Sequence, residues 1–299
     1  MTRTPMASPA SRATPMSWRT FVDGLVDFLL PGACVLCRRA HAPGHTENRT
    51  EDGIVCGTCL ARLVPLALPQ CARCGHPRLS LGIPLPIARP TAAGPTWPSA
   101  VDLPPCRWCA HLDPAIRTVR SVCRMDDGTG GELVHALKYQ GWHRVAPAMA
   151  RRMARLDWPQ DVREERAAVI PMPLSTQRLR ERGYNQAEVL ARALAPHWQV
   201  PVWRDVLRRE RHTRSQVRLT PSQRTSNVSG AFAVPDHRRA MLRGQHVVLV
   251  DDVVTTAATL NAAAQALLEG GARIISCVTF GRAPDSGDRA ASDDDSLRN

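Results

Sequence analysis

Residues 247–259 read Val-Val-Leu-Val-Asp-Asp-Val-Val-Thr-Thr-Ala-Ala-Thr, and this stretch decides the fold. Its first four residues are apolar, as in a fully buried strand of a parallel sheet. Asp251 and Asp252 come where we expect that strand to end, and we expect a helix over Leu260–Leu268 to follow. In open α/β sheets, ligands bind beyond the carboxyl ends of the strands, and a helix N-terminus there offers N–H groups to phosphate. The stretch therefore predicts a site for a ligand that carries both hydroxyls and phosphate, such as a ribose phosphate.

Strands alternate with helices on both sides of this stretch. We predict strands over Thr118–Arg124, Ala167–Met172, Val200–Leu207 and Ile274–Phe280, and helices over Gly130–Tyr139, Arg144–Leu156 and Asn185–Leu194. Gly270 and Gly271 should end the helix that follows the decisive stretch. This alternation predicts an α/β fold built on a parallel sheet with right-handed crossovers.

Composition limits the classes of protein to which the chain can belong. Its 299 residues, 43% of them hydrophobic, suffice for one large domain or two modest ones. The longest apolar stretch, Phe21–Leu30, is interrupted by charges, so we expect neither a membrane span nor a secretory signal, and a cytoplasmic location. The formal charge of +12 fits a solvated surface rich in arginine, or a polyanionic partner such as nucleotide phosphates or nucleic acid.

The texture of the chain suggests four parts. Residues 1–16 are rich in Ser, Thr, Pro and Ala and are expected to be disordered. Residues 17–112 begin with an amphipathic helix over Trp18–Leu30 and continue as a small cysteine-rich unit. We assign residues 113–283 to the α/β domain and residues 284–299 to a disordered acidic tail.

Eight of the ten cysteines form four Cys-x-x-Cys pairs. The pairs are Cys34/Cys37, Cys56/Cys59, Cys71/Cys74 and Cys106/Cys109. Two such pairs complete a closed tetrahedral four-sulfur site, so we predict two structural Zn²⁺ ions. Sequential pairing is the simplest arrangement, and an interleaved one remains open. Cys123 and Cys277 lie on predicted strands, where we expect small core residues.

Several further motifs together resemble one family. They are Leu-Leu-Pro-Gly-Ala-Cys (29–34), Ala-Leu-Lys-Tyr-Gln-Gly (136–141), Val-Ile-Pro-Met-Pro-Leu (169–174), Arg-Leu-Arg-Glu-Arg-Gly-Tyr-Asn-Gln-Ala (178–187) and Thr-Arg-Ser-Gln-Val-Arg-Leu (213–219). With the cysteine pairs and residues 247–259, they make residues 17–282 resemble the competence-protein ComF family. The resemblance implies a double zinc ribbon fused to a type I phosphoribosyltransferase-like domain.

The resemblance implies roles for the decisive stretch. Asp251 and Asp252 match the catalytic pair that holds the ribose hydroxyls of phosphoribosyl pyrophosphate (PRPP), with Mg²⁺ bridging pyrophosphate and ribose. The residues that match the 5′-phosphate loop are Thr255, Thr256, Ala257, Ala258 and Thr259. Carboxylates accept hydrogen bonds from hydroxyls, while amides and hydroxyls donate to phosphate, so the chemistry agrees. The other interpretation of the two carboxylates is a charge pair near a helix N-terminus.

Basic residues elsewhere match the pyrophosphate side of such a site. Arg178 and Arg182 follow the loop after Pro173, and guanidinium forks suit phosphate oxygens. Lys138 either reaches the same anion or caps its own helix. Residues 211–224 align with the flexible hood of type I enzymes, in which Gln216 and Arg224 are the most ligand-like residues. A hood would exclude water from a reactive ribosyl centre.

Ala257 departs from the family pattern, which has glycine at this position. Glycine permits a positive φ and a close approach of backbone to phosphate. If Ala257 had to be left-handed, it would cost on the order of 1–2 kcal/mol, and phosphate binding would either tolerate this or weaken.

Two functions follow from these observations. The first is a Mg²⁺-dependent phosphoribosyltransferase that uses PRPP and an unidentified acceptor. The alternative is a non-catalytic protein of the transformation machinery, one that handles single-stranded DNA or acts as a scaffold for DNA-uptake proteins. The two are compatible, and the small number of Tyr and Phe residues (2 and 4) argues against a general base-stacking platform.

Overall fold

The computed structural model describes residues 33–40, 54–78, 90–91, 94–95, 106–125, 128–210 and 230–284. The predicted disordered N-terminus and Trp18–Leu30 helix, the basic segment 211–224 and the acidic tail from Asp285 lie outside these residues. Within the described ranges, no helix combines the length and apolar character needed to cross a membrane.

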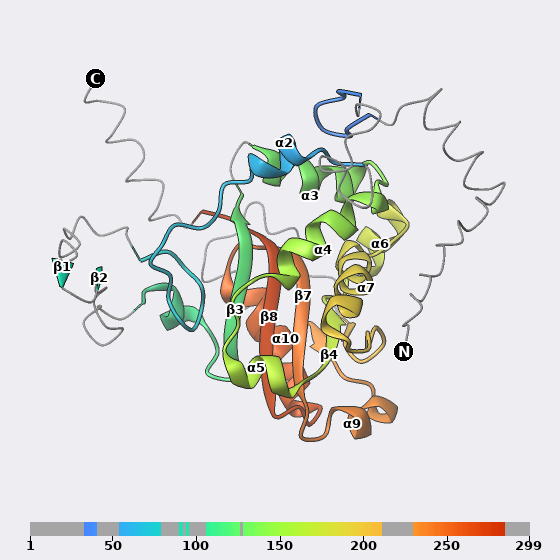
Figure 1. Ribbon diagram of the computed structural model, residues 1–299. Helices are drawn as coiled ribbons and strands as arrows, with labels where there is room; N and C mark the ends of the chain where they lie inside the picture. The colour runs from blue at the N-terminus through green and yellow to red at the C-terminus, as the bar shows by residue number, and fades with distance from the viewer. Residues whose placement is uncertain are drawn as a thin grey trace, which may run out of the picture.

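A four-stranded parallel sheet with the order β3-β8-β7-β4 forms the centre of the fold (Figure 1). Its strands are β3 (Ile116–Arg124), β4 (Arg166–Pro171), β7 (His246–Val254) and β8 (Ile274–Arg282). The two central strands are buried over almost their whole length, as expected when both faces of a parallel sheet are covered. The predicted parallel α/β fold is therefore confirmed.

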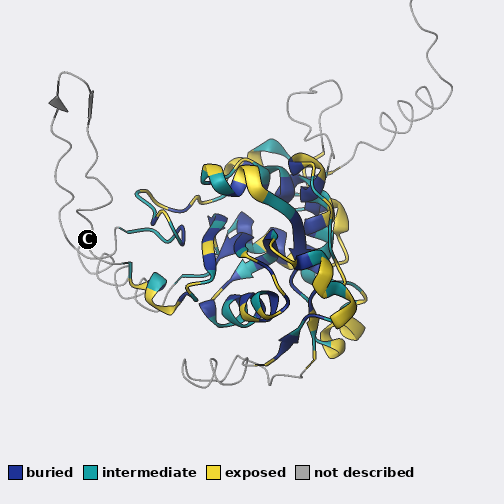
Figure 2. Cartoon of the chain, turned by 90° about the horizontal axis from the view of Figure 1, so that it is seen from below, coloured by how far each residue is buried: buried dark blue, intermediate teal, exposed yellow. Residues whose placement is uncertain are grey.

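Helices cover both faces of this sheet (Figure 1), and the buried residues gather between the layers (Figure 2). One face carries α3 (Thr129–Tyr139), α4 (Ala146–Ala154) and α7 (Gln186–Trp198), and the other carries α10 (Ala257–Glu269). Successive strand residues point to opposite faces. Val248 and Val250 of β7 therefore pack with α4 and α7, whereas Val247 and Leu249 pack with α10.

Shorter elements complete the described part of the chain. They are α2 (Gly57–Ala61), η3 (Trp108–His111), η4 (His143–Val145), α5 (Gln160–Glu165), α6 (Thr176–Arg182), α9 (Asp236–Leu242), and the antiparallel pairs β1 (Pro90–Thr91) with β2 (Gly94–Pro95) and β5 (Arg208–Arg209) with β6 (Phe232–Ala233).

Two sequence predictions need correction. Val200–Leu207 is not a strand, since only Val202 forms a bridge, with Val169 of β4. Pro201 accepts from Val169 but has no N–H of its own, so a regular ladder cannot continue there. The strand predicted to end at Val250 continues to Val254, because β8 pairs with it that far. The two carboxylates therefore lie within β7 and not after it.

The cysteine-rich segment lies along the outer edge of β3. An uncovered edge strand would expose unpaired backbone groups. Here the N–H of Arg124 donates to the carbonyl of Val64 at 2.9 Å, and the N–H of Val119 donates to the carbonyl of Arg73 at 2.9 Å. The cysteine-rich segment and the α/β domain thus share backbone hydrogen bonds along this edge.

Candidate functional site

The two acidic residues of β7 lie beyond the end of the neighbouring strand β4. Because β4 stops at Pro171, opposite Val250, Asp251 and Asp252 extend past it. As consecutive strand residues they point to opposite faces of the sheet. Asp252 contacts residues of α3 and α7, and Asp251 shares the parity of Leu249, which packs with α10.

Asp252 is buried in a network that holds it charged. It is 3% exposed. The ammonium of Lys138 forms an ion pair with its Oδ2, and Nε2 of Gln186 donates to its Oδ1 at 3.0 Å. Burial opposes the charge, but Lys138 and these hydrogen bonds outweigh it and hold the pKa of Asp252 below its usual value. Asp252 is therefore a fixed carboxylate at neutral pH.

Asp251 differs from its neighbour. It is half-buried, and its Oδ1 accepts from the backbone N–H of Asp252 at 2.8 Å. Burial, followed by the negative charge of Asp252, raises the pKa of Asp251 well above its usual value. The two carboxylates thus divide: one favours its charged form and the other favours a proton.

The network around Asp252 joins two of the sequence motifs. A guanidinium nitrogen of Arg182 donates to Oε1 of Gln186, and the hydroxyl of Tyr184 donates to the carbonyl of Leu137 in α3. Among the described residues, Lys138 forms an ion pair with Asp252, and its ammonium donates no hydrogen bond to the carbonyl groups that end its own helix. The 136–141 and 178–187 motifs therefore meet at this carboxylate. Gln186 had no role in the sequence interpretation, because its contact depends on how α7 is oriented.

The loop between β7 and α10 presents donor groups beside the carboxylates. Thr255 is exposed, and Thr256 is the N-cap of α10. Oγ1 of Thr256 is buried without a hydrogen-bond partner among the described residues. The first N–H groups of the helix, at Ala257, Ala258 and Thr259, have no acceptor within the helix. An anion at this N-terminus would satisfy both kinds of donor.

The expected strain at Ala257 is not present. Thr256 is extended, with φ −128° and ψ 161°, and Ala257 is the first residue of α10. Among the described residues, the non-glycine positions with positive φ are Arg38 and Gln199. Because the chain enters the helix directly from an extended N-cap, position 257 needs no left-handed conformation. The cost considered for a left-handed alanine therefore does not arise.

Arg178 and Arg182, which follow the predicted pyrophosphate loop, lie on α6, a helix that the sequence did not predict. Its N-cap, Ser175, accepts from the N–H of Arg178 at 3.3 Å, and Gly183 ends it with φ 80°. Arg178 is exposed, whereas Arg182 is half-buried and lies 5.2 Å from the centre of the Tyr139 ring. Gln216 and Arg224 lie outside the described residues.

Arg209 joins the site from β5. Burial lowers its pKa, the charge of Arg178 lowers it further, and the carboxylate of Asp251 raises it. Arg209 therefore lies within electrostatic range of both residues. No feature of the sequence indicated that Arg209 belongs to the site, since a two-residue strand paired with Phe232 leaves no periodic signal.

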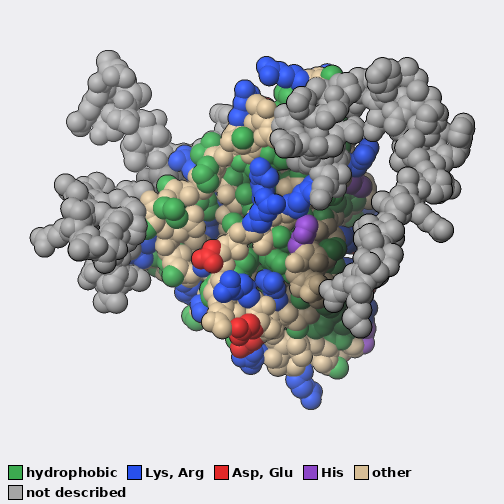
Figure 3. All heavy atoms as spheres, viewed as in Figure 1, with side chains coloured by type: hydrophobic (Ala, Val, Ile, Leu, Met, Phe, Trp, Pro, Cys, Tyr) green, Lys and Arg blue, Asp and Glu red, His purple; other side chains and the backbone are tan. Residues whose placement is uncertain are grey.

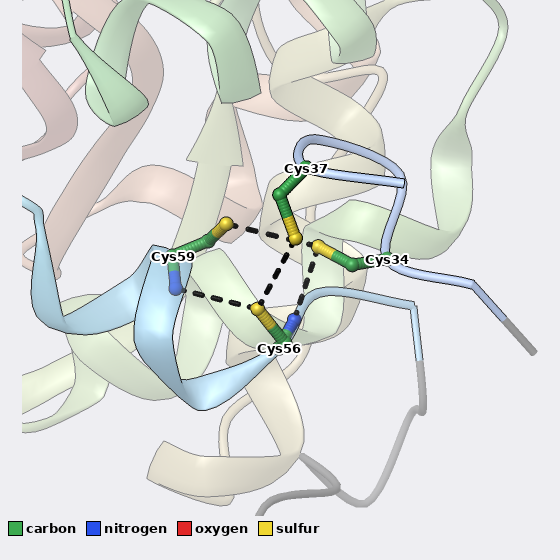
Figure 4. A group of neighbouring side chains, drawn as sticks. All are labelled: Cys34, Cys37, Cys56 and Cys59. Carbon is green, nitrogen blue, oxygen red and sulfur yellow. Dashed lines mark hydrogen bonds between the residues drawn. The ribbon is translucent and has the colours of Figure 1, made fainter. Parts of the chain in front are cut away.

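The eight paired cysteines form two clusters with sequential pairing. The first contains Cys34, Cys37, Cys56 and Cys59 (Figure 4), and the second contains Cys71, Cys74, Cys106 and Cys109. Sulfur–sulfur distances are 3.8 and 3.7 Å in the first cluster and 3.5 and 3.4 Å in the second. Zinc bound at about 2.3 Å to four tetrahedral sulfurs would put them about 3.8 Å apart. The residues present fit structural Zn²⁺ in both clusters.

The electrostatics of the clusters also call for a cation. Contact with Cys74 is the main cause that lowers the pKa of Cys71 to about 3. Burial raises the pKa of Cys109 to about 11. Several buried thiolates repel one another, so holding four together requires a bound divalent ion. Cys123 and Cys277 belong to neither cluster and are fully buried on β3 and β8, as predicted.

Comparison with known proteins agrees with this architecture. Residues 25–90 match the family described as "Double zinc ribbon domain", and residues 180–298 match the one described as "Phosphoribosyl transferase domain". The fold and the two cysteine clusters thus define a double zinc ribbon joined to a domain of the phosphoribosyltransferase type.

Individual relatives identify the family within this class. The DNA utilization protein YhgH of Salmonella typhimurium is 30% identical over 255 residues, which cover 82% of this chain and 95% of that protein. Competence protein F of Haemophilus influenzae is 37% identical over 94 residues, covering 31% of this chain and 41% of its own length. Competence protein ComFC of Bacillus subtilis is 33% identical over 103 residues, covering 34% and 39%. The chain belongs to the ComF family, as its motifs predicted.

Proposed function

We propose that this protein binds a ribose 5-phosphate ligand of the PRPP type at the carboxyl end of β7. The observation that carries the proposal is the buried Oγ1 of Thr256, which has no hydrogen-bond partner in the described part of the chain and lies at the N-terminus of α10, beside the two carboxylates of β7. A phosphate at this position would satisfy the hydroxyl and the first N–H groups of the helix together. The matching phosphoribosyl transferase family supports this assignment.

Each acidic residue has a distinct part in the proposal. Asp252, kept ionised by Lys138, accepts a hydrogen bond from a ribose hydroxyl. The pKa of Asp251 is raised, so this residue favours a proton in the absence of a cation. An approaching cation favours the charged carboxylate, which then binds the cation. Mg²⁺ uses one or two carboxylates together with substrate oxygens, and this donor set fits it. When bound, the ion would neutralise charge on the pyrophosphate.

We further propose that the site transfers the phosphoribosyl group. The bond between ribose C1 and pyrophosphate oxygen would break, its electron pair would leave with pyrophosphate, and an acceptor nucleophile would form the new bond to C1. The chain's contribution is positioning and charge stabilisation. Arg209, within electrostatic range of Asp251, and Arg178, within electrostatic range of Arg209, are suited to hold the departing pyrophosphate.

Calorimetric titration with ribose 5-phosphate and with PRPP plus Mg²⁺ tests binding. We expect Asp251→Asn/Asp252→Asn to abolish PRPP binding, and Thr256→Val to weaken both ligands by about tenfold, the worth of one hydrogen bond to a charged group. Asp236→Asn, which alters an exposed carboxylate on α9, is the matched control and should bind as the wild type does. Unchanged PRPP affinity in the double variant would refute the proposed site. Pyrophosphate release in a screen of nucleophilic metabolites tests transfer.

A second candidate function, the handling of single-stranded DNA, is supported by a specific surface. Tyr139, the last residue of α3, and Trp142, the N-cap of η4, are 68% and 40% exposed, and the guanidinium of Arg182 lies over the Tyr139 ring. Figure 3 shows Lys and Arg side chains spread over one face with few Asp or Glu side chains among them. The relatives named for DNA utilization and competence point the same way.

Anisotropy of a labelled oligothymidine at several salt concentrations tests this second function. Binding should weaken as salt rises, with a slope of roughly −0.7 for each neutralised phosphate. Tyr139→Ala/Trp142→Ala should weaken binding by tenfold or more, since stacking contributes about 1–3 kcal/mol per base. Leu68→Ala removes an exposed apolar side chain elsewhere and is the control. Absence of binding at low salt would reject DNA handling and leave the PRPP site untouched.

A further inference from the structure

The backbone of the second cysteine cluster is attached to the α/β domain at three consecutive residues. Its Cys71-x-x-Cys74 turn offers carbonyl groups to the sheet, and each of them is used. The carbonyl of Ala72 accepts from Arg120 at 2.8 Å, that of Arg73 from Val119 and Thr118 at 2.9 and 2.8 Å, and that of Cys74 from Arg282 at 2.5 Å. The turn is therefore held in place by β3 and by the end of β8.

Arg282 is the unusual member of this set. It is the last residue of β8, it is 3% exposed, and its guanidinium lies 4.5 Å from the centre of the Trp108 ring. Its Nε and Nη1 are buried and have no hydrogen-bond partner among the described residues. A buried, incompletely paired cation is costly unless a negative charge lies nearby. Four thiolates around one Zn²⁺ carry a net charge of about −2 and would supply it.

The backbone of the same arginine borders the proposed phosphate loop. Arg282 pairs with Val254 at the end of β7, and the N–H of Ala283 donates to the carbonyl of Val254 at 2.9 Å. Val254 directly precedes Thr255. The side chain of Arg282 thus contacts the second cluster, while its backbone pairs with Val254, the residue that precedes the 255–259 loop.

The other end of the loop has its own attachment to the second cluster. Asn261 lies one turn into α10; its Nδ2 donates to the carbonyl of His111 at 2.7 Å, and its Oδ1 accepts from the N–H of Asp113 at 2.9 Å. His111 belongs to η3, which also contains Cys109. The phosphate loop is therefore bracketed between two contacts with the segment that forms this cluster.

We propose that zinc in the second cluster sets the geometry of the 255–259 loop, and that Arg282 and Asn261 are the positioning residues that join the two. The role of the loop in binding phosphate rests on the proposed function, whereas the mechanical link does not. The first cluster lacks this connection in the described residues: there, a side-chain hydrogen bond runs from Arg152 of α4 to the carbonyl of Leu60, at 3.2 Å. Zinc loss from the second cluster, and not from the first, loosens the loop.

Two measurements on the full-length, zinc-loaded protein test this inference. The first is release of each zinc ion to a chromogenic chelator, and the second is hydrogen–deuterium exchange of peptides spanning residues 254–262. Arg282→Met should speed the release of one zinc ion by about 10- to 100-fold, the usual effect of removing an outer partner of a metal site. It should also raise exchange in 254–262. Arg152→Met, the matched control, should leave exchange in 254–262 at the wild-type level.

Equal zinc release in Arg282→Met and wild type, or unchanged exchange in 254–262, would overturn the inference. If Arg282→Met does not fold, the same two measurements are made on two other variants. They are Arg282→Lys, which keeps the charge but loses the guanidinium group, and Asn261→Ala. By linkage, ribose 5-phosphate should tighten the equilibrium binding of zinc to the second cluster in the wild type. If ribose 5-phosphate does not bind the wild type at all, the proposed function fails, while zinc release and exchange still decide this inference.

Discussion

Replacing Lys138 by Met removes the cation from the most buried carboxylate of the site and keeps the apolar stem of the side chain. Asp252 retains its hydrogen bond from Gln186 but loses its ion pair. Removing one partner of a buried pair costs about 3–5 kcal/mol. Because the Lys138 side chain is 22% exposed, water reaches the gap, and we expect the lower end, about 3 kcal/mol at pH 8. For a domain of this size, that lowers Tm by about 6–12 °C.

The loss should depend on pH with a definite sign. In the wild type the pKa of Asp252 is lowered, so its charge stabilises the native state above the unfolded pKa of about 3.9 and this is lost as pH falls through the folded pKa. In Lys138→Met, the ammonium no longer opposes burial, so the pKa of Asp252 rises above its unfolded value. The charge of Asp252 then destabilises the native state. As pH rises, the stability lost in Lys138→Met therefore grows by about 1.4 kcal/mol per pH unit until the pH passes the raised pKa of Asp252. Urea unfolding at several pH values between about 4.5 and 8, followed by Trp fluorescence with zinc present, measures this growth, which a deficit of about 3 kcal/mol completes within about two pH units.

The double variant Lys138→Met/Asp252→Asn decides whether charge is the cause. An amide at position 252 can still accept from Gln186, so removing both charges should recover most of the stability lost in Lys138→Met. A double variant that loses the sum of the two single effects would refute the reasoning, as would a Lys138→Met deficit that shrinks as pH rises.

Three further predictions concern single positions. Ala257→Gly should lower stability by up to about 1 kcal/mol, because Ala257 is already helical, and should change ribose 5-phosphate affinity less than twofold; a tenfold gain by calorimetry would contradict this. Burial lowers the pKa of His246, so its ring stays neutral in the native state, and the free energy of unfolding decreases as the pH drops below about 6.5. In His246→Gln this decrease should be smaller, as measured by urea unfolding at pH 7 and pH 6. Gly75→Ala places a Cβ 2.8 Å from the carbonyl oxygen of Val119 at φ +66°, so it should cost at least about 1–2 kcal/mol and speed zinc release; a Tm equal to wild type would count against it.

The sheet was predictable because its strands are buried on both faces. Residues 247–250 and 274–280 are nearly all apolar and lie in the centre of the sheet, where burial leaves little ambiguity. Val200–Leu207 carries a similar apolar density but lies against the edge of β4, where Pro201 interrupts the ladder. Apolar content predicts burial, and it does not by itself predict backbone pairing.

The site was predictable in its residue types and less so in its contacts. The adjacency of Asp251 and Asp252 and the threonines after them are written in the sequence. Which of the two carboxylates meets Lys138 depends on the face that β7 presents to α3, which is fixed by packing between distant elements. The pairing of the cysteines is similar: spacing allows several pairings, and the positions of the four turns in the fold bring them together sequentially.

The opposite pKa shifts of Asp251 and Asp252 predict how ligand binding at the proposed site depends on pH. A ligand that brings Mg²⁺ to Asp251 must displace the proton that burial and Asp252 favour there, so binding should release a proton and strengthen as pH rises through the raised pKa. Ribose 5-phosphate without a metal ion has less need of a charged Asp251, and its affinity should vary less with pH. Titrating both ligands in buffers of different ionisation enthalpy separates the two cases. Equal proton release for the two ligands would place the metal away from Asp251, whereas release confined to PRPP with Mg²⁺ assigns the ion to Asp251.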